Sequence, residues 1–321
     1  MVFKKVLGAF GIGGPSVDTV LADPLVQPGA DLTGEVRITG GKHQVSIEHV
    51  ALNLVTHVHS EHGPQTVEFH RAVVAGQFLL GAGEDKVVPF VLPLPWESPI
   101  TEVYGQHLHG MNLGVRTELS VAKAIDKGDL DLVSVQPLPT QHRVLEAFHQ
   151  LGFRFKKADV ERGRIQGLNQ QLPFYQEIEF YPPGQFAGQV NEVELTFVTN
   201  PGELVVVLEA DKRGGFFSSG QDVFGRFHVT HEQAMATDWA AELSGWLQQV
   251  VERRHQYSGS QKGFGGDQYG GQYGGHYGDH DERRRGPGMG GMVAGAAAGL
   301  AGGMILGEVL DGTGEEFFGD E

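Results

Sequence analysis

Histidines are the residues of this sequence best suited to chemistry, because they gather in its first half. The candidates are His57, His59, His62, His70, His107 and His109. Imidazole is a common zinc ligand, and His57 and His59 project from the same face of one predicted strand, as two ligands would. The spacing fixes neither a carboxylate nor a third histidine beside them, and that face is predicted to be exposed to solvent. We therefore expect no metal site.

Motifs for catalysis and cofactor binding are absent from the sequence. It contains no G-x-S-x-G turn, no H-E-x-x-H pair, no Walker loop and no dinucleotide-binding glycine pattern. Gly81-Ala82-Gly83 lies between two predicted strands, where glycine serves a turn. We therefore expect a protein that is not an enzyme and that binds no cofactor.

The amino-acid composition limits the classes of partner that the protein can bind. The chain of 321 residues carries a formal charge of −16, which repels the phosphate backbone of nucleic acid. It has no cysteine, so it has neither disulfides nor thiolate metal sites, and a reducing compartment such as the cytoplasm is allowed. Proteins are the expected partners, and nucleic acid is excluded.

The element that must position His57 and His59 is a strand from Val45 to His59. Val50, Leu52, Leu54 and Val58 alternate with polar residues, which is typical of a strand with one buried face. We expect this strand to form a hairpin with a strand from Leu32 to Ile38 across the Gly40-Gly41 break. The same pattern returns at Val193, Leu195 and Phe197, so one β-sandwich design is predicted to occur twice.

The first predicted sandwich covers residues 1–133. Its strands are Val17–Leu21, Leu32–Ile38, Val45–His59, Val67–Ala75, Lys86–Leu92 and Asn112–Ala124, after which Asp126 to Asp129 turn the chain away. Proline removes a backbone donor, so the run containing Pro89, Pro93, Pro95 and Pro99 is predicted to be an edge strand that leaves the sheet.

Residues 134–139 form a stiff linker, and the second predicted sandwich with its helices covers residues 140–256. Thr140 is predicted to cap a junction helix that ends at Gly152. Strands follow at Phe153–Lys157, Ile165–Leu168, Phe174–Tyr181, Val190–Thr199, Leu204–Ala210 and Val223–Val229. Asn200-Pro201-Gly202 predicts a type II turn. A longer helix from His231 to Arg254, with a Thr230–Gln233 capping box, is predicted to lie on the sandwich rather than to be exposed.

Both ends of the chain differ from its middle. Phe3, Val6, Leu7 and Phe10 have helical spacing, which favours a short amphipathic helix over a signal peptide. Residues 257–288 are a Gly/Tyr/Gln-rich segment predicted to be a flexible linker, and residues 311–321 are an acidic end. Within residues 289–310, glycines recur at every fourth position and would form one groove on a helix, at Gly291, Gly295, Gly299, Gly303 and Gly307. Such a helix could self-associate or insert in a membrane; disorder or a soluble role is the alternative.

Several motifs in order resemble the bacterial sporulation-control (SpoOM) family over about residues 1 to 250. They are SVDTVLADPLVQPGADLTGEVRITGG, LPWESPIT, HLHGMNLGVRTELSVAKAIDKGDLD with the following QPLP, and LPFYQEIEFYPP. The resemblance implies two tandem arrestin-like β-sandwich domains, no catalytic residues, and a cytoplasmic role in sporulation or related envelope processes through protein binding. The tail from Gly259 lies outside the resemblance.

The sequence therefore predicts an arrestin-like adaptor that presents sheet edges to partner proteins. The edge at Pro89 to Pro99 and the groove near the Thr140 helix are the expected contact regions. The interaction candidates are Pro89, Pro93, Pro95, Trp96, Phe148, Trp239 and Trp246. A membrane-tethered structural protein that acts through the glycine groove is the stronger alternative, and an undetected hydrolase or metal enzyme is the weaker one. Self-association and peripheral membrane contact stay open.

Overall fold

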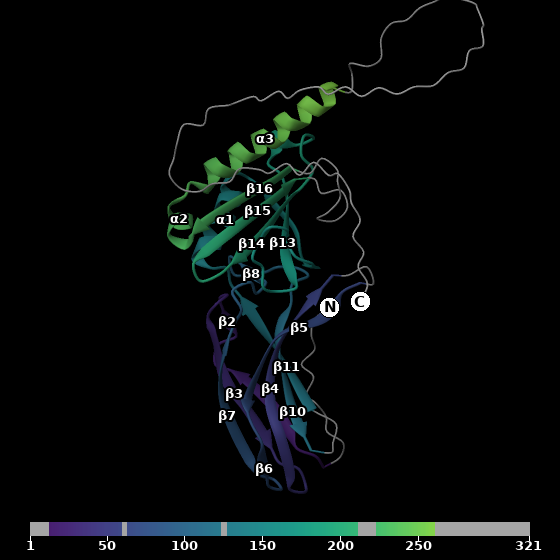
Figure 1. Cartoon of the computed structure of the whole chain (residues 1–321). Helices are drawn as coiled ribbons and strands as arrows, with labels where there is room; N and C mark the ends of the chain where they lie inside the picture. The colour runs from purple at the N-terminus through teal and green to yellow at the C-terminus, as the bar shows by residue number, and fades with distance from the viewer. Residues whose placement is uncertain (1–12, 60–62, 123–126, 211–222, 261–321) are drawn as a thin grey trace, which may run out of the picture.

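The computed structural model describes residues 13–59, 63–122, 127–210 and 223–260. Its first half consists of strands (Figure 1). They are β1 (Ser16–Leu21), β2 (Leu25–Val26), β3 (Asp31–Thr39), β4 (Val45–Val58), β5 (Gln65–Ala75), β6 (Phe78–Leu80), β7 (Asp85–Pro93), β8 (Glu102–Val103), β9 (Gln106–His107), β10 (Leu113–Val121) and β11 (Lys127–Val135).

These strands form a sandwich of two sheets, with the short hairpin β8–β9 beside it. One sheet has the order β1-β3-β7, and the other has the order β2-β11-β10-β4-β5 with β6 beside β4. Their facing side chains make the core, for example Val36 and Ile38 of β3 with Leu52 and Leu54 of β4. The mainly β fold and the predicted first sandwich agree with this arrangement.

Strand pairing corrects three details of the prediction. β3 and β4 do not form a hairpin, because β3 pairs with β1 and β7 while β4 pairs with β5, β6 and β10. The chain therefore crosses from one sheet to the other at Gly40-Gly41. Lys127 to Asp129, predicted to turn the chain away, instead belong to β11, which pairs with β10. The short strands β2, β6, β8 and β9 have too little periodicity to be predicted.

The second half combines one sheet with helices. Its elements are α1 (Pro139–Gln150), β12 (Arg154–Arg162), β13 (Phe174–Tyr181), the 3-10 turn η1 (Gly184–Phe186), β14 (Val193–Thr199), β15 (Glu203–Ala210), β16 (Val223–Thr230), α2 (His231–Ala236) and α3 (Trp239–Ser260). The sheet is antiparallel with the order β12-β13-β14-β15-β16. Figure 1 shows α3 lying across it.

Helices take the place of the second sheet that a second sandwich requires. Leu195, Leu204 and Phe227 of the sheet share a core with Phe148 of α1 and Trp246 of α3. In the part of the chain that the structure describes, this half therefore has one sheet, which corrects the prediction of two. The physical reason is that the predicted amphipathic helices bury their apolar stripes on the sheet and supply the second layer themselves.

Local details of the second half also differ from prediction. The long helix is interrupted at Thr237 and Asp238, while the predicted Thr230–Gln233 capping box is present. Residues 165–168 are a loop, and Ile165 packs on the sheet face opposite the helices.

One predicted helix cap and one predicted turn take other forms. The N-cap of α1 is Leu138, whose backbone N–H donates to the Gln141 side chain at 2.8 Å, so Thr140 lies inside the first turn. The turn at Gly202 is not type II, because that glycine lacks the positive φ which type II requires. Asn200 Oδ1 instead accepts from the Gly202 and Glu203 backbone N–H groups.

Candidate functional site: the junction and the sheet edges

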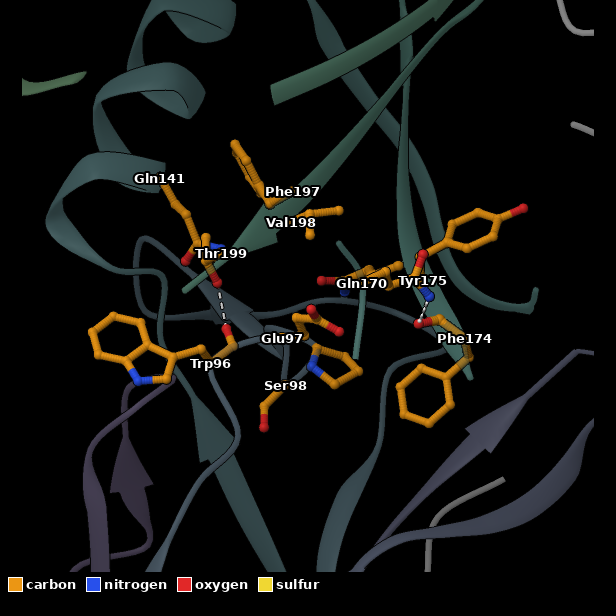
Figure 2. A pocket seen from close by; sticks show the side chains of 12 residues that line it. Trp96, Glu97, Ser98, Gln141, Gln170, Phe174, Tyr175, Phe197, Val198 and Thr199 are labelled. Carbon is orange, nitrogen blue, oxygen red and sulfur yellow. Dashed lines mark hydrogen bonds between the residues drawn. The ribbon is translucent and has the colours of Figure 1, made fainter. Parts of the chain in front are cut away.

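The loop that follows β7, residues 94–101, docks the first half onto the second (Figure 2). Its Trp96 carbonyl accepts a hydrogen bond from the Thr199 hydroxyl. The Trp96 ring lies against Gly29, where a Cβ atom would come within 2.4 Å of the ring, and 5.8 Å from the His231 ring between centroids. Gly29 has φ +76, so glycine is required there for both space and conformation.

Two side chains of the junction satisfy backbone groups of the opposite half. The Glu97 carboxylate accepts from the backbone N–H groups of Gln171 at 2.8 Å and Leu172 at 2.7 Å. The Gln176 amide both accepts from the Ile100 N–H at 3.0 Å and donates to the Ile100 carbonyl at 2.7 Å. These bonds link the two halves directly, and breaking the part-buried ones, to Leu172 and Ile100, removes partners from backbone groups with limited access to water.

His59 contributes to the same junction. Its backbone N–H donates to the Val160 carbonyl at 2.7 Å, and its ring lies 3.6 Å from the Asp159 carboxylate and 3.9 Å from that of Glu161. His57 is half-buried, and desolvation lowers its pKa. No three potential metal ligands gather within residues 13–59, 63–122, 127–210 and 223–260. His70, His107 and His109 lie apart from this contact, and His62 lies outside the described residues.

A groove of about 300 Å³ lies beside α1, near the region that the sequence indicated. Its walls include Tyr104, Pro137, Pro139 and His142. Tyr104 and Gly105 have φ values of +53 and +72 at the tip of the β8–β9 hairpin, as a type I′ turn requires. The Tyr104 ring packs edge-on to His142 at 5.0 Å, and partial burial, with a smaller contribution from Glu146, raises its pKa.

The proline-containing strand β7 is an edge strand. The Leu94 N–H donates to Ala30 and the Glu84 carbonyl accepts from Gly40, so even-numbered residues direct their backbone groups toward β3. Odd-numbered residues therefore face away from the sheet, and Pro89 and Pro93 remove two of the donors on that edge. Val87 and Val91, on either side of Pro89, are 54% and 60% exposed. The edge is accessible but poorly equipped to pair with another strand.

The other interaction candidates occupy two environments. Pro95 and Trp96 are partly exposed at the junction. Phe148, Trp239 and Trp246 are buried in the core between helices and sheet, so a partner would reach them only if the helices moved. The glycines Gly291, Gly295, Gly299, Gly303 and Gly307 lie outside the described residues.

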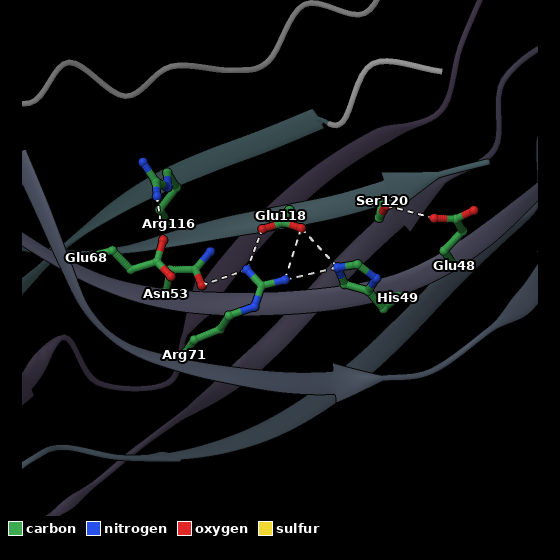
Figure 3. Close-up of polar contacts among 8 residues, drawn as sticks. All are labelled: Glu48, His49, Asn53, Glu68, Arg71, Arg116, Glu118 and Ser120. Atoms are coloured by element: carbon green, nitrogen blue, oxygen red, sulfur yellow. Dashed lines mark hydrogen bonds and ion pairs between the residues drawn. The ribbon is translucent and has the colours of Figure 1, made fainter. Parts of the chain in front are cut away.

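A polar network covers the outer face of the large sheet in the first half (Figure 3). Arg71 donates to Glu118 at 2.5 Å and to Asn53 at 3.1 Å, and the His49 ring lies 2.9 Å from Glu118. The hydrogen bond from Arg71 lowers the pKa of Glu118 to about 2. Asn53 lies on the face of β4 that carries His57 and His59 and that was predicted to be exposed, yet it is 0% exposed because its register neighbours Arg71 and Arg116 flank it on both sides.

Sequence reasoning missed a row of carboxylates on the second sheet, on the face opposite the helices. Glu179, Glu194 and Glu209 lie directly opposite one another on β13, β14 and β15. Glu194 is 5% exposed and Glu209 is 1% exposed. A bulge at residues 155–157 accompanies Lys156 and Lys157, which both form ion pairs with Glu179. A single glutamate flanked by apolar residues in each strand, Glu194 in β14 and Glu209 in β15, was the available signal.

Taken together, the fold and these sites define a mainly β protein of two interlocked halves whose distinctive surfaces are sheet edges. In the part of the chain that the structure describes, no helix is both long and apolar enough to cross a membrane.

Comparison with known proteins identifies the family. The family model described as SpoOM protein matches residues 3–214, and the chain belongs to this family. The sporulation-control protein Spo0M of Bacillus subtilis strain 168 is 34% identical over 216 residues, which cover 66% of this chain and 81% of that protein. The predicted resemblance is confirmed.

Solved structures agree. The crystal structure of Spo0M from Bacillus subtilis matches with a TM-score of 0.66 and 30% identity, over 74% of this chain and 100% of that chain. A β-glucosidase from Listeria innocua in complex with isofagomine matches 39% of this chain and 16% of its own with a TM-score of 0.23, which is too low to support an argument. The relatives named for sporulation control support a regulatory role related to sporulation.

Proposed function

We propose that this chain is a non-enzymatic, arrestin-like adaptor that regulates sporulation by binding other proteins in the cytoplasm. The observation that carries the proposal is the junction, where Glu97, Gln176 and Trp96 fix the two halves relative to each other. A fixed orientation presents surfaces of both halves to one partner at the same time. The family membership supports the sporulation context, and the surface of the protein supports binding rather than catalysis.

Complementation tests the proposal. The chain is expressed in Bacillus subtilis lacking Spo0M, beside a Glu97→Ala/Gln176→Ala variant that loses the junction bonds. The intact chain is expected to restore sporulation frequency at least in part, and the junction variant is expected to restore less at equal protein level. Gln65→Ala, an exposed change on β5, is the matched control. If the junction variant restores sporulation as well as the Gln65→Ala control does, the junction bonds play no part in the mechanism.

The proposed adaptor function also requires that a partner protein be identified. Photo-crosslinking from exposed positions of the complementing chain, followed by mass spectrometry, is expected to recover the same protein from independent cultures. If the complementing chain crosslinks to no protein, the adaptor proposal fails even though the regulatory role stands.

A membrane-tethered role through the glycine run is the second candidate, and the observation that favours it is the four-residue spacing from Gly291 to Gly307 after three arginines. Membrane fractionation with a high-pH wash compares the full chain with a version ending at Ser260. Retention of only the full chain in the washed pellet supports an anchor. Equal solubility of both versions rules the anchor out and leaves self-association or a spacer role for the tail.

A further inference from the structure

Exposed sheet edges attract other strands, and most edges of this protein carry a device that prevents such pairing. β7 has two prolines on its free edge, as shown above. β5 is irregular, because its pairing with β4 shifts register at two places. β12 has a bulge and two lysines, and part of its edge is used by His59. The free edge of β1 is capped where the Asp129 carboxylate accepts from the Thr19 N–H at 3.0 Å.

Among the described residues, β16 has no proline, no register shift and no carboxylate cap, and its one charged residue in this range is Arg226. Its eight residues pair with β15 in one unbroken register, from Thr230 opposite Glu203 to Val223 opposite Ala210. β16 contains neither proline nor a bulge, and no strand in the part of the chain that the structure describes pairs with its other side. A regular edge of this length is a template for an added strand.

The side chains of β16 indicate what kind of strand would pair there. Phe227 and Val229 face the helices, so Arg226 and His228 project from the opposite face of the sheet. Both are partly exposed. Antiparallel pairing with a second copy of β16 would bring the Arg226 side chains of the two copies close together, and like charges across a strand pair are unfavourable. Carboxylates on the added strand would instead complement this edge.

We propose that β16 binds an extended segment of a partner protein by strand addition, and that this segment carries aspartate or glutamate at alternate positions opposite Arg226 and His228. The inference rests on the proposed adaptor function and names the surface and the partner chemistry for it. It also moves the predicted strand-addition site from the proline edge β7 to β16.

Binding of synthetic peptides to the full-length protein tests the proposal. One capped, fluorescein-labelled peptide alternates glutamate with threonine, and the matched peptide alternates lysine with threonine. Fluorescence anisotropy is expected to show that wild-type protein binds the glutamate peptide at least about threefold more tightly, given the size of cross-strand charge pairs. Hydrogen exchange is expected to slow at residues 223–230 when that peptide is bound.

Charge reversal provides the specific control. Arg226→Glu/His228→Glu is expected to reverse the peptide preference, whereas Val87→Glu/Val91→Glu on β7 keeps it unchanged. Arg226→Gln is the milder variant if the reversal unfolds the protein, and it is expected to lose the preference without reversing it. Slower hydrogen exchange at residues 85–93 or 65–75 instead of 223–230 would overturn the proposal. Failure of both peptides to bind would overturn it too.

Three further outcomes are decisive. A wild-type dimer in light scattering that the charge-reversal variant abolishes would assign β16 to a second copy, contrary to the proposal. If the partner found by crosslinking in cells still binds the charge-reversal variant with unchanged affinity, the β16 assignment fails and the adaptor function stands. If no cellular partner exists, the adaptor function fails whatever the peptides show.

Discussion

In the first half, β3 and β4 face each other from opposite sheets, whereas in the second half β14 and β15 lie side by side and helices face them. Both halves meet the same requirement, because a strand with an apolar face must bury it against a second layer. A second sheet provides this layer in one half, and α1 and α3 provide it in the other. Similar strand patterns are therefore compatible with different partners across the core.

The largest expected effect comes from breaking the helical layer. Phe148 of α1 lies 4.5 Å from both Phe153 and Phe180 between ring centroids. We expect Phe148→Ala to destabilise the protein by about 3–5 kcal/mol, because the cavity lies between helix and sheet. Urea unfolding measures the loss, and hydrogen exchange should show β13 to β15 opening before β4 and β10. Simultaneous opening of both halves would contradict the view that each half has its own second layer, a sheet in the first half and helices in the second.

Uncoupling the halves is expected to have the next largest effect. Gln176→Ala removes two hydrogen bonds to Ile100 and leaves its backbone N–H and carbonyl without these partners. We expect a loss of about 1–3 kcal/mol. The unfolding transition, followed by hydrogen exchange at β13 to β15 for the second half and at β4 and β10 for the first, should separate into two steps. Coincident transitions in the variant, as in the Gln65→Ala control, would show that the junction bonds do not couple the halves.

The polar network of the first half gives a pH-dependent effect. The folded-state pKa of Glu118 is lowered to about 2, so its ion pair with Arg71 stabilises the protein above the unfolded pKa of Glu, about 4.3, and this stabilisation is lost as pH falls toward 2. Glu118→Gln is expected to cost about 0.5–1 kcal/mol at pH 7.

The comparison of pH profiles checks that assignment. The difference in stability between wild type and Glu118→Gln should shrink as pH is lowered from about 4.3 toward 2, because wild type then also loses the charge. A difference that does not change over this interval would mean that the charge of Glu118 contributes nothing.

The smallest effect is expected on the edge of the first sandwich. Val91 is exposed on β7, and its substitution by threonine removes no buried contact. The free energy of unfolding, obtained from thermal unfolding, should fall by less than about 0.5 kcal/mol. A larger loss would mean that β7 is covered by another part of the chain and would remove it from the comparison of free edges.

The positions of most long strands could be predicted because alternation of apolar residues reports a buried face directly. The edge position of β7 followed from its prolines, and the capping box at Thr230 followed from its spacing with Gln233. β11 was missed because acidic residues and glycine at 126–129 look like the end of a domain, although Lys127 to Asp129 pair with β10 as part of a strand.

The candidate site was predictable only in part. The sequence pointed to the proline-rich loop and to the region beside Thr140, and the structure places the junction and the groove there. It did not point to β16, since an edge strand and a central strand can have the same alternation, and only the pairing distinguishes them. The carboxylate row also depends on pairing, because Glu179 is distant in sequence from Glu209.

The sequence alone determined most of the long strands and the helices, the family and the absence of cysteine, since propensity, periodicity and motif order are properties of neighbouring residues. Only the tertiary structure decided which strands share a sheet, which layer covers each sheet, and which edges remain open. These choices depend on contacts between residues far apart in the chain, such as Ile100 with Gln176 and Thr19 with Asp129. A local pattern indicates that a face must be buried, but it does not indicate which element covers that face.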